Sequence, residues 1–229
     1  MIHLARRYLE VLPADHAMVK LDFSNAFNSL HRHDVLMSVL SRVTELCAYC
    51  YSAYSHPSML FYGSYVILFE EGPQEGDPLG PLLFCNTIQP LLSSLNSELN
   101  LGYLDDVALA GPADTVASDV VDITQLGGAM GLVLNTGKCE LIAHDIGDIS
   151  LLGVPLFTGI VLDNAWFARC DNLTRVADRL HLINAQDALI LLRSSFSAPK
   201  VLHLLRCSPS VSFIQSFRAG AQPTLYSSA

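Results

Sequence analysis

The stretch that decides the fold is LGYLDDVALA, residues 101–110. Two short apolar runs flank the adjacent aspartates Asp105 and Asp106. Apolar runs of this length that meet at turn-forming residues predict a β-hairpin with both carboxylates at its tip. Two neighbouring negative charges repel each other unless a cation lies between them, and Mg²⁺ prefers oxygen ligands such as carboxylates. The alternative interpretation is a solvated turn, because an isolated Asp-Asp pair is a weak signal.

Two segments upstream of the hairpin strengthen the metal interpretation. In VKLDFSNAFN, residues 19–28, a short apolar strand runs into Asp22, and polar residues that can cap a helix follow. In EGPQEGDPLGPLLF, residues 71–84, a glycine-rich loop precedes an Asp-Pro pair that suits a helix start. Leucines then recur at helical spacing, at positions 79, 82, 83, 91, 92, 95 and 99. The sequence therefore predicts a helix packed under the hairpin.

In this order and at these separations, the three segments resemble motifs A, B and C of reverse transcriptases, most closely those of non-LTR (LINE-type) retrotransposons. Residues 131–140 resemble motif D, and residues 151–156 resemble the segment that leads to the primer grip. The helical segments after residue 186 match the family less closely. The resemblance implies a palm-centred fragment of an RNA-directed DNA polymerase. Its implied partners are an RNA template, a nucleic-acid primer and dNTP.

The chemistry of nucleotide addition explains the three carboxylates. Charge develops on the attacking and the leaving oxygen of an in-line displacement, and two metal ions stabilise both. The resemblance implies that Asp22 and Asp105 bridge two Mg²⁺ ions, or Mn²⁺ in their place, with Asp106 as a third carboxylate. The backbone carbonyl of Phe23 is a candidate neutral ligand. Because aspartate side chains are short, the strand that ends at Asp22 is expected to lie beside the hairpin in an antiparallel sheet.

The resemblance assigns roles to two further side chains. It places Phe27 under the sugar of the incoming nucleotide, where an aromatic ring excludes a 2′-hydroxyl and selects dNTP over rNTP. The alternative for Phe27 is an ordinary core position on a helix. Lys138, in the motif D segment, is a candidate proton donor to the leaving pyrophosphate, or else a solvated lysine at the edge of a strand.

One departure from the family pattern lies in the motif B segment. The resemblance implies that Gln74, Glu75 and Gly76 bind the nucleotide, together with Phe23 of the motif A segment. The family has Gln immediately before the glycine, where this chain has Glu75. An ionised Glu repels a triphosphate and donates no hydrogen bond. This substitution places the polymerase activity in doubt even though all three aspartates are present.

The predicted fold class is α+β, a polymerase palm whose antiparallel sheet is covered on one side by helices. Residues 1–158 are assigned to the palm with incomplete fingers, and residues 159–229 to a helical, thumb-like region with a frayed end. Strands are predicted at 18–23, 58–62, 65–70, 101–110 (the hairpin), 132–134, 139–142 and 151–157. Helices are predicted at 25–30, 33–54, 79–98, 114–129 and from residue 161 onward.

Composition limits what the chain is expected to do alone. The 229 residues carry a net charge of −9, which is the wrong sign for a free-standing nucleic-acid binder. Few residues precede Asp22, so the basic fingers of the family are expected to be missing, unless Arg6 and Arg7 are a remnant of them. The second hypothesis is therefore a catalytically dead remnant of a retroelement that acts at most as a protein or nucleic-acid interaction module.

The sequence contains neither a long apolar membrane span nor a signal peptide, so an intracellular location in the cytoplasm or nucleus is expected. Cys47 and Cys50 have the spacing of half a zinc site. They lie in a helical pattern without a second ligand pair, which favours buried thiols.

Overall fold

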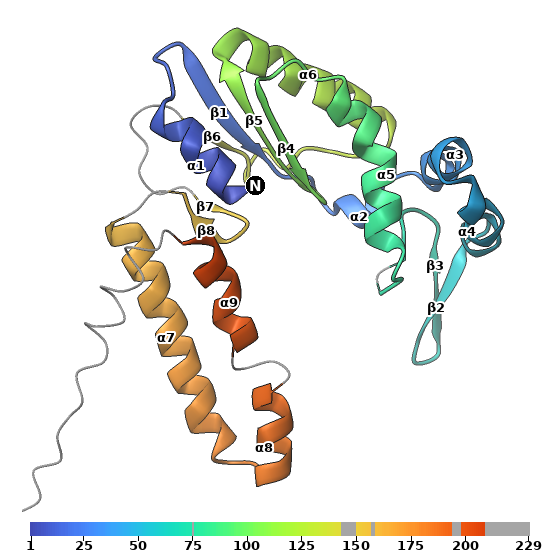
Figure 1. The fold of residues 1–229 in the computed structure, drawn as a ribbon. Coiled ribbons are helices and arrows are strands. Elements are labelled where there is room, and N and C mark those ends of the chain that lie inside the picture. Colours follow the sequence, from blue (N-terminus) through green and yellow to red (C-terminus); the bar gives the residue numbers. More distant parts are fainter. Residues whose placement is uncertain (75, 143–149, 157–158, 194–197, 209–229) are drawn as a thin grey trace, which may run out of the picture. The chain divides into compact units, whose positions relative to one another are not determined.

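The computed structural model describes residues 1–74, 76–142, 150–156, 159–193 and 198–208 (Figure 1). The chain forms two compact units. One lies within Leu12–Asp145, and the other combines Met1–Val11 with residues from Ile146 onward. The division of the chain near residue 158 into a palm and a thumb-like region stays a prediction, because the compact units are grouped differently.

The first unit is built on a four-stranded antiparallel sheet with the strand order β4-β5-β1-β6. Its strands are β1 (His16–Leu21), β4 (Leu99–Tyr103), β5 (Asp106–Pro112) and β6 (Glu140–Ile142). Strands β4 and β5 form the predicted hairpin, and β1 pairs with β5. The expectation that the strand leading to Asp22 lies beside the hairpin is confirmed.

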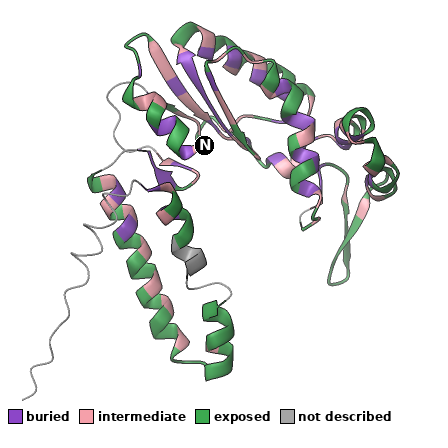
Figure 2. Ribbon diagram, viewed as in Figure 1, coloured by how far each residue is buried: buried purple, intermediate pink, exposed green. Residues whose placement is uncertain are grey.

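Two helices, α5 (Gly80–Ser93) and α6 (Ala113–Ala129), cover one face of this sheet (Figure 1). Helix α6 packs on β5 and β1, and α5 packs on α6 and β4. The core lies between these layers, where Leu21, Leu109 and Ile123 have at most 1% of their surface exposed. Figure 2 shows buried residues along the strands and along the inner faces of both helices. The predicted α+β class with helices on one side of an antiparallel sheet is confirmed.

The segment between motifs A and B is helical and then forms a hairpin. It contains α2 (Ala26–Ser29), α3 (Arg32–Arg42), η1 (Thr44–Leu46), α4 (Cys47–Tyr54), β2 (Ser58–Tyr62) and β3 (Tyr65–Phe69). The single helix predicted over residues 33–54 is wrong, because Val43 leaves helical geometry at φ −136° and ψ 56°. The β2–β3 hairpin has the predicted position, and its apolar side chains are largely exposed.

Two other predicted elements differ from the prediction, one in length and one in kind. The motif B helix ends at Ser93 instead of residue 98, and Leu99 begins β4. Residues 132–134 form no strand, and the only pairing there is an isolated antiparallel bridge between Phe23 and Leu134. The helix ends where Ser93 and Ser94 interrupt the leucine pattern, and the Asn-Thr-Gly run after Leu134 favours a turn over a strand.

The second unit contains helix α1 (Ile2–Glu10), the strand pair β7 (Ser150–Leu151) and β8 (Val154–Pro155), and the helices α7 (Ile160–Leu180), α8 (Ala185–Leu191) and α9 (Ala198–Cys207). The strand predicted over residues 151–157 is instead a tight hairpin with a turn at Leu152–Gly153. None of the described helices is long and apolar enough to cross a membrane.

Buried Arg6 connects three elements of this second unit. Its guanidinium donates hydrogen bonds to the carbonyls of Pro155 and Leu156, and also to that of Cys207 at the end of α9. Burial lowers the pKa of Arg6, and the nearby Cys207 only partly opposes this effect. Arg6 is therefore a packing residue of this unit, which leaves its guanidinium committed to backbone carbonyls.

Candidate active site

The carboxylates predicted as metal ligands come from two adjacent strands. Leu21 of β1 stands opposite Val107 of β5, so Asp22 follows β1 at the edge where β5 begins with Asp106. Asp105 lies in the turn before β5. The register of two antiparallel strands therefore brings the motif A and motif C aspartates to one edge of the sheet.

The turn that carries Asp105 has an unusual backbone. Tyr103 pairs with Asp106 across a two-residue turn, and Leu104 has φ +55°, in the left-handed region. A bulky side chain is disfavoured there, and such conformations cluster at functional sites. The turn holds Asp105 clear of the strand pairing that fixes Asp106.

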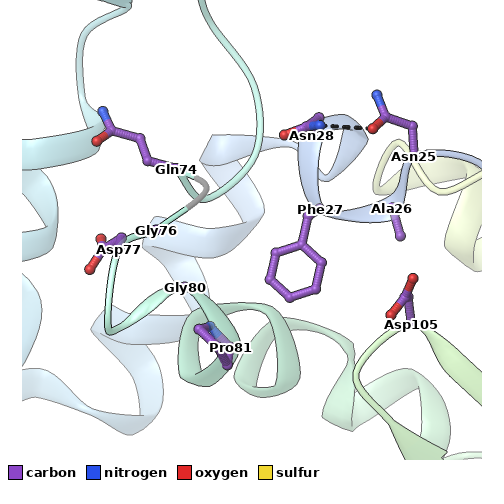
Figure 3. Close-up of a pocket in the computed structure, with 10 residues that line it drawn as sticks. All are labelled: Asn25, Ala26, Phe27, Asn28, Gln74, Gly76, Asp77, Gly80, Pro81 and Asp105. Atoms are coloured by element: carbon purple, nitrogen blue, oxygen red, sulfur yellow. Dashed lines mark hydrogen bonds between the residues drawn. The ribbon is translucent and has the colours of Figure 1, made fainter. Parts of the chain in front are cut away.

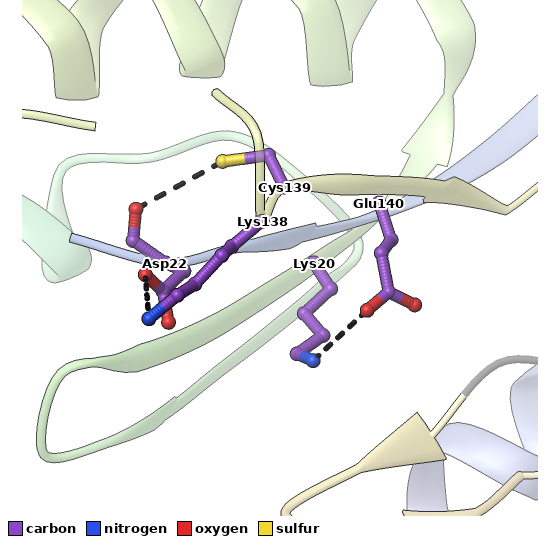
Figure 4. A network of polar contacts seen from close by, with 5 residues as sticks. All are labelled: Lys20, Asp22, Lys138, Cys139 and Glu140. Atoms are coloured by element: carbon purple, nitrogen blue, oxygen red, sulfur yellow. Dashed lines mark hydrogen bonds and ion pairs between the residues drawn. The ribbon is translucent and has the colours of Figure 1, made fainter. Parts of the chain in front are cut away.

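The aspartates interact electrostatically. The pKa of Asp106 is raised first by burial and then by the charge of Asp105, with a smaller contribution from Asp22, while Lys20 opposes the shift. Asp22 Oδ1 is buried and has no hydrogen-bond partner, and the Nζ of Lys138 lies 3.8 Å from it (Figure 4). That distance exceeds a hydrogen bond. The edge therefore concentrates negative charge that the protein only partly compensates.

The donor set has the chemistry of a Mg²⁺ site, and the buried Oδ1 of Asp22, which accepts no hydrogen bond, is the kind of atom that a cation would satisfy. Across the described ranges, however, no group of three or more His, Cys, Asp or Glu side chains converges closely enough to hold a metal ion. Phe23, whose carbonyl is the candidate neutral ligand, has a buried side chain and pairs with Leu134. The metal assignment of these residues stays a prediction.

A pocket of about 490 Å³ lies next to this edge (Figure 3). Motif A, motif B and motif C all contribute to its wall. Its lining residues are Asn25, Ala26, Phe27, Asn28, Gln74, Gly76, Asp77, Gly80, Pro81 and Asp105. The volume lies in the range typical of small-ligand sites. Three segments that are distant in the sequence thus line one open pocket, with the carboxylates of Asp77 and Asp105 in its wall.

Phe27 both lines this pocket and packs against the core. Its ring stacks on Phe84 of α5 with a centroid distance of 4.5 Å and an interplanar angle of 12°. Figure 3 shows the ring between the motif A segment and α5, with Asp105 nearby. The two interpretations of Phe27 from the sequence, a sugar-contacting residue and a core residue, are compatible in one position.

The motif B loop is positioned by hydrogen bonds to the neighbouring α4 and β2. Gln74 donates from its side chain to Ser58, and its backbone NH donates to the hydroxyl of Tyr54 at 3.3 Å. The same hydroxyl donates to Asp77, and the pKa of Tyr54 is raised first by its burial and then by this contact. Gly76 has φ +88° and open space at its Cβ position. Glu75, the departure from the family pattern, lies outside the described residues.

Sequence reasoning missed three side chains near the site. Asn25 lines the pocket in a left-handed conformation and accepts a hydrogen bond from Asn28 at 2.8 Å. Arg32 is buried, donates to the carbonyls of His56 and Gly72, and thereby fixes the loop before motif B. Lys20 precedes Asp22 by two residues, and this spacing was the available signal, because alternate residues of a strand share a face.

Comparison with known proteins agrees with this geometry. The family of reverse transcriptases (RNA-dependent DNA polymerases) matches residues 2–156. No curated protein sequence is significantly similar to the chain.

Among solved structures, apo telomerase from Candida tropicalis is similar over 90% of this chain and 47% of its own, with a TM-score of 0.54 and 14% identity. Telomerase from Candida albicans in complex with the TWJ fragment of telomeric RNA is similar over 95% and 46%, with a TM-score of 0.52 and 12% identity. Telomerase from Candida tropicalis in complex with the TWJ fragment of telomeric RNA is similar over 89% of this chain and 44% of its own, with a TM-score of 0.51 and 13% identity.

At these identities the structural likeness shows the fold alone, and this chain spans less than half the length of each of these structures. The family match covers well over half of the chain and includes every element of the candidate site. The chain therefore belongs to the reverse transcriptase family of RNA-directed DNA polymerases.

Proposed function

We propose that this chain is the palm of a retrotransposon reverse transcriptase of the non-LTR type, which transfers a nucleotide from dNTP to a primer 3′ end. The observation that carries the proposal is the pocket that joins motifs A, B and C around Asp105. A nucleotide in this pocket would lie beside the edge where Asp22 and Asp106 meet. The non-LTR origin rests on the sequence of the motifs alone.

In this proposal Asp22, Asp105 and Asp106 hold two Mg²⁺ ions, with the carbonyl of Phe23 as a further ligand. Bound Mg²⁺ supplies charge stabilisation for the attacking and leaving oxygens. The ring of Phe27, fixed by its stack on Phe84, faces the sugar. Gln74 and Gly76 contribute polar contacts and close backbone approach from the opposite wall.

Lys138 is proposed as the residue that contacts or protonates the leaving pyrophosphate. Its side chain is 69% exposed and already reaches within 3.8 Å of Asp22. An ammonium at this position is free to move between the carboxylate and a phosphate. A general acid must reach the reacting group, and an exposed lysine beside Asp22 supports this assignment.

Template and primer are proposed partners. The chain carries 13 Lys and Arg residues against 22 Asp and Glu, so it offers little charge for neutralising phosphates. We therefore expect polymerase activity to require further polypeptide that supplies basic fingers, because orientation of the triphosphate contributes much of the acceleration. The chain on its own is expected to show little or no templated synthesis.

The test is primer extension by the chain joined to the fingers of a related reverse transcriptase, with and without Asp105→Asn. Loss of this carboxylate is expected to reduce Mg²⁺-dependent extension by at least about 10²-fold, since charge is removed where it is most needed. Asp114→Asn, at the exposed first turn of α6, is the matched control. Near-parental extension by Asp105→Asn would refute the assignment.

The competing function is a dead remnant that binds partners without catalysis. Titration of the unmodified chain with Mn²⁺, which is followed by its paramagnetic effect on water protons, separates the two functions. Binding that Asp105→Asn abolishes favours the polymerase. Absence of Mn²⁺ binding, together with absent extension in the fingers fusion, favours the remnant.

A further inference from the structure

Lys20 lies in β1 two residues before Asp22, so both side chains are on the same face of the sheet. Its Nζ is 3.2 Å from Oε1 of Glu140, which stands directly opposite in β6 (Figure 4). Only 16% of the Lys20 side chain is exposed, compared with 38% for Glu140. The ammonium is thus held in place by a neighbouring strand.

On its other side Lys20 stands opposite Ala108 of β5. Asp106 precedes Ala108 by two residues and therefore shares this face. Lys20, Asp22 and Asp106 therefore lie on one face of two paired strands, where the ammonium attracts both carboxylates. No other Lys or Arg lies within the four strands β1, β4, β5 and β6. One fixed cation thus opposes the repulsion of the acidic edge.

The chain has only three lysines, and two of them, Lys20 and Lys138, lie near the aspartate edge. Lys138 is mostly exposed and reaches Asp22 from the loop before β6, whereas Lys20 is enclosed by the sheet. An exposed lysine is easily exchanged for a solvent cation. An enclosed lysine that is paired with Glu140 stays in place whatever binds at the edge.

We propose that Lys20, oriented by Glu140, is a positioning residue that acts as the built-in counter-ion of the aspartate edge. It allows Asp22 and Asp106 to fold side by side before any metal arrives. Glu140 restrains the ammonium, which would otherwise swing onto the aspartates and compete with an incoming divalent cation. The first role is independent of the proposed polymerase function, and the second rests on it.

The first role is tested by thermal unfolding of the whole chain in EDTA. Lys20→Met is expected to lower Tm by about 2–4 °C. In the Asp106→Asn background the same substitution is expected to change Tm by less than half as much, because the repulsion is already gone. Arg42→Met removes an exposed charge from α3 of the same unit and controls for net charge.

An ordinary cross-strand pair would lose the same stability in both backgrounds, so equal losses overturn the counter-ion role. If Lys20→Met does not fold, the folding of the double variant with Asp106→Asn tests the counter-ion role. Recovery of folding supports the role, and failure of the double variant to fold overturns it.

The second role is tested by repeating the melts in MgCl2. Mg²⁺ is expected to raise the Tm of Lys20→Met more than that of the parent, and to raise the Tm of Glu140→Gln less. Equal shifts for all three proteins overturn the restraint by Glu140. If Mg²⁺ shifts none of them, the metal site of the proposed function and the restraint by Glu140 both fail, while the comparison in EDTA still decides the counter-ion role.

Discussion

The ring of Phe27 packs against the core and also lines the pocket. Its stack on Phe84 fixes the ring plane, and its position in the pocket wall presents that ring to a bound ligand. A rigid aromatic side chain rejects an extra hydroxyl by steric clash, and rejection is effective only when the ring cannot yield. The packing against Phe84 is therefore what would make Phe27 a good filter.

We predict that Phe27→Val increases rNTP incorporation relative to dNTP, because a smaller side chain makes room for the 2′-hydroxyl. The measurement is the ratio of kcat/KM for the two sugars in the fingers fusion. Phe84→Leu is expected to raise the ratio less than Phe27→Val does, since it loosens the Phe27 ring but leaves it in the wall. An unchanged ratio for Phe27→Val would show that Phe27 acts only in packing.

Gly72 is a second residue on which the site depends. It has φ +71°, and a Cβ there would lie 1.9 Å from the carbonyl oxygen of Phe27. Its NH donates to the carbonyl of Leu30 at 2.8 Å. The loop before motif B can approach motif A this closely only through a glycine.

Gly72→Ala is predicted to destabilise the chain by about 3 kcal/mol or more, from backbone strain and overpacking together. Gly63→Ala separates the two effects, because Gly63 has a similar φ of +60° but open space around its Cβ position. Gly63→Ala should lower the free energy of unfolding by about 1 kcal/mol. Chemical denaturation measures both, and similar losses would mean that the backbone contact to Phe27 is unimportant.

At the scale of elements, α6 is tied to the connection between α5 and β4 by buried Asp119. Its carboxylate accepts hydrogen bonds from the NH groups of Asn96 and Ser97 and from the Ser97 hydroxyl. Burial alone would raise the pKa of Asp119, but the hydrogen bonds from Ser97 and Asn96 outweigh it and lower the pKa. A helix and a loop are thereby joined through one ionised group.

Asp119→Ala is predicted to cost about 1–3 kcal/mol at neutral pH, because buried donors lose their acceptor. A lowered pKa stabilises the fold above the pKa of the unfolded chain, and this contribution disappears as pH falls through the folded pKa. The difference between parent and variant in urea denaturation should therefore shrink below about pH 4. Asp122→Ala on the same helix is the matched control for the loss of a carboxylate and the gain of an alanine.

The sequence predicts the elements whose pattern is local. The hairpin around Asp105 and the helix after it follow from apolar runs and turn residues that are close together in the chain. The break at Val43 could not be predicted, since α3 and α4 continue the same apolar periodicity across it. The helix predicted over residues 79–98 was too long for the same reason, although Ser94 and Ser97 signal an interruption.

The candidate site divides in the same way. The position of Asp22 at the same edge of the sheet as Asp106 was predictable, because the metal interpretation requires the strand that leads to Asp22 to lie beside the hairpin. The contribution of Lys20 depends on its pairing with Glu140, which lies 120 residues away in the chain. The packing role of Arg6 is still harder to predict from the sequence, since its hydrogen-bond acceptors lie 149 to 201 residues further along the chain. Long-range partners leave no local pattern.

For the molecule as a whole, the exposed apolar surface of the β2–β3 hairpin has the largest consequence. Phe61, Tyr62, Tyr65 and Met59 are 65–76% exposed, and half or more of the surface of Leu60, Val66, Ile67 and Leu68 is also exposed. A two-stranded hairpin with apolar side chains on both faces is marginally stable alone and favours association. This agrees with a mean hydropathy of +0.36 despite the net charge of −9.

Phe61→Thr combined with Ile67→Thr is predicted to reduce self-association of the chain, because it removes one large apolar side chain from each face while keeping strand propensity. Sedimentation velocity at several concentrations measures the effect. Val121→Thr, at an exposed position of α6, is the matched control. Unchanged self-association of the double variant would show that the association surface lies outside the β2–β3 hairpin.

The division into compact units also sets an order of events during synthesis. Helix α1 leaves the ribosome early, but it belongs with residues from Ile146 onward, and Arg6 bonds to the carbonyl of Cys207, 201 residues later. At about 5–20 residues per second, this interval lasts roughly 10–40 s. The sheet that carries the aspartates can form within that time. During this interval the apolar face of the amphipathic α1 has no packing partner. A chaperone that binds nascent chains would therefore protect α1 most during this interval.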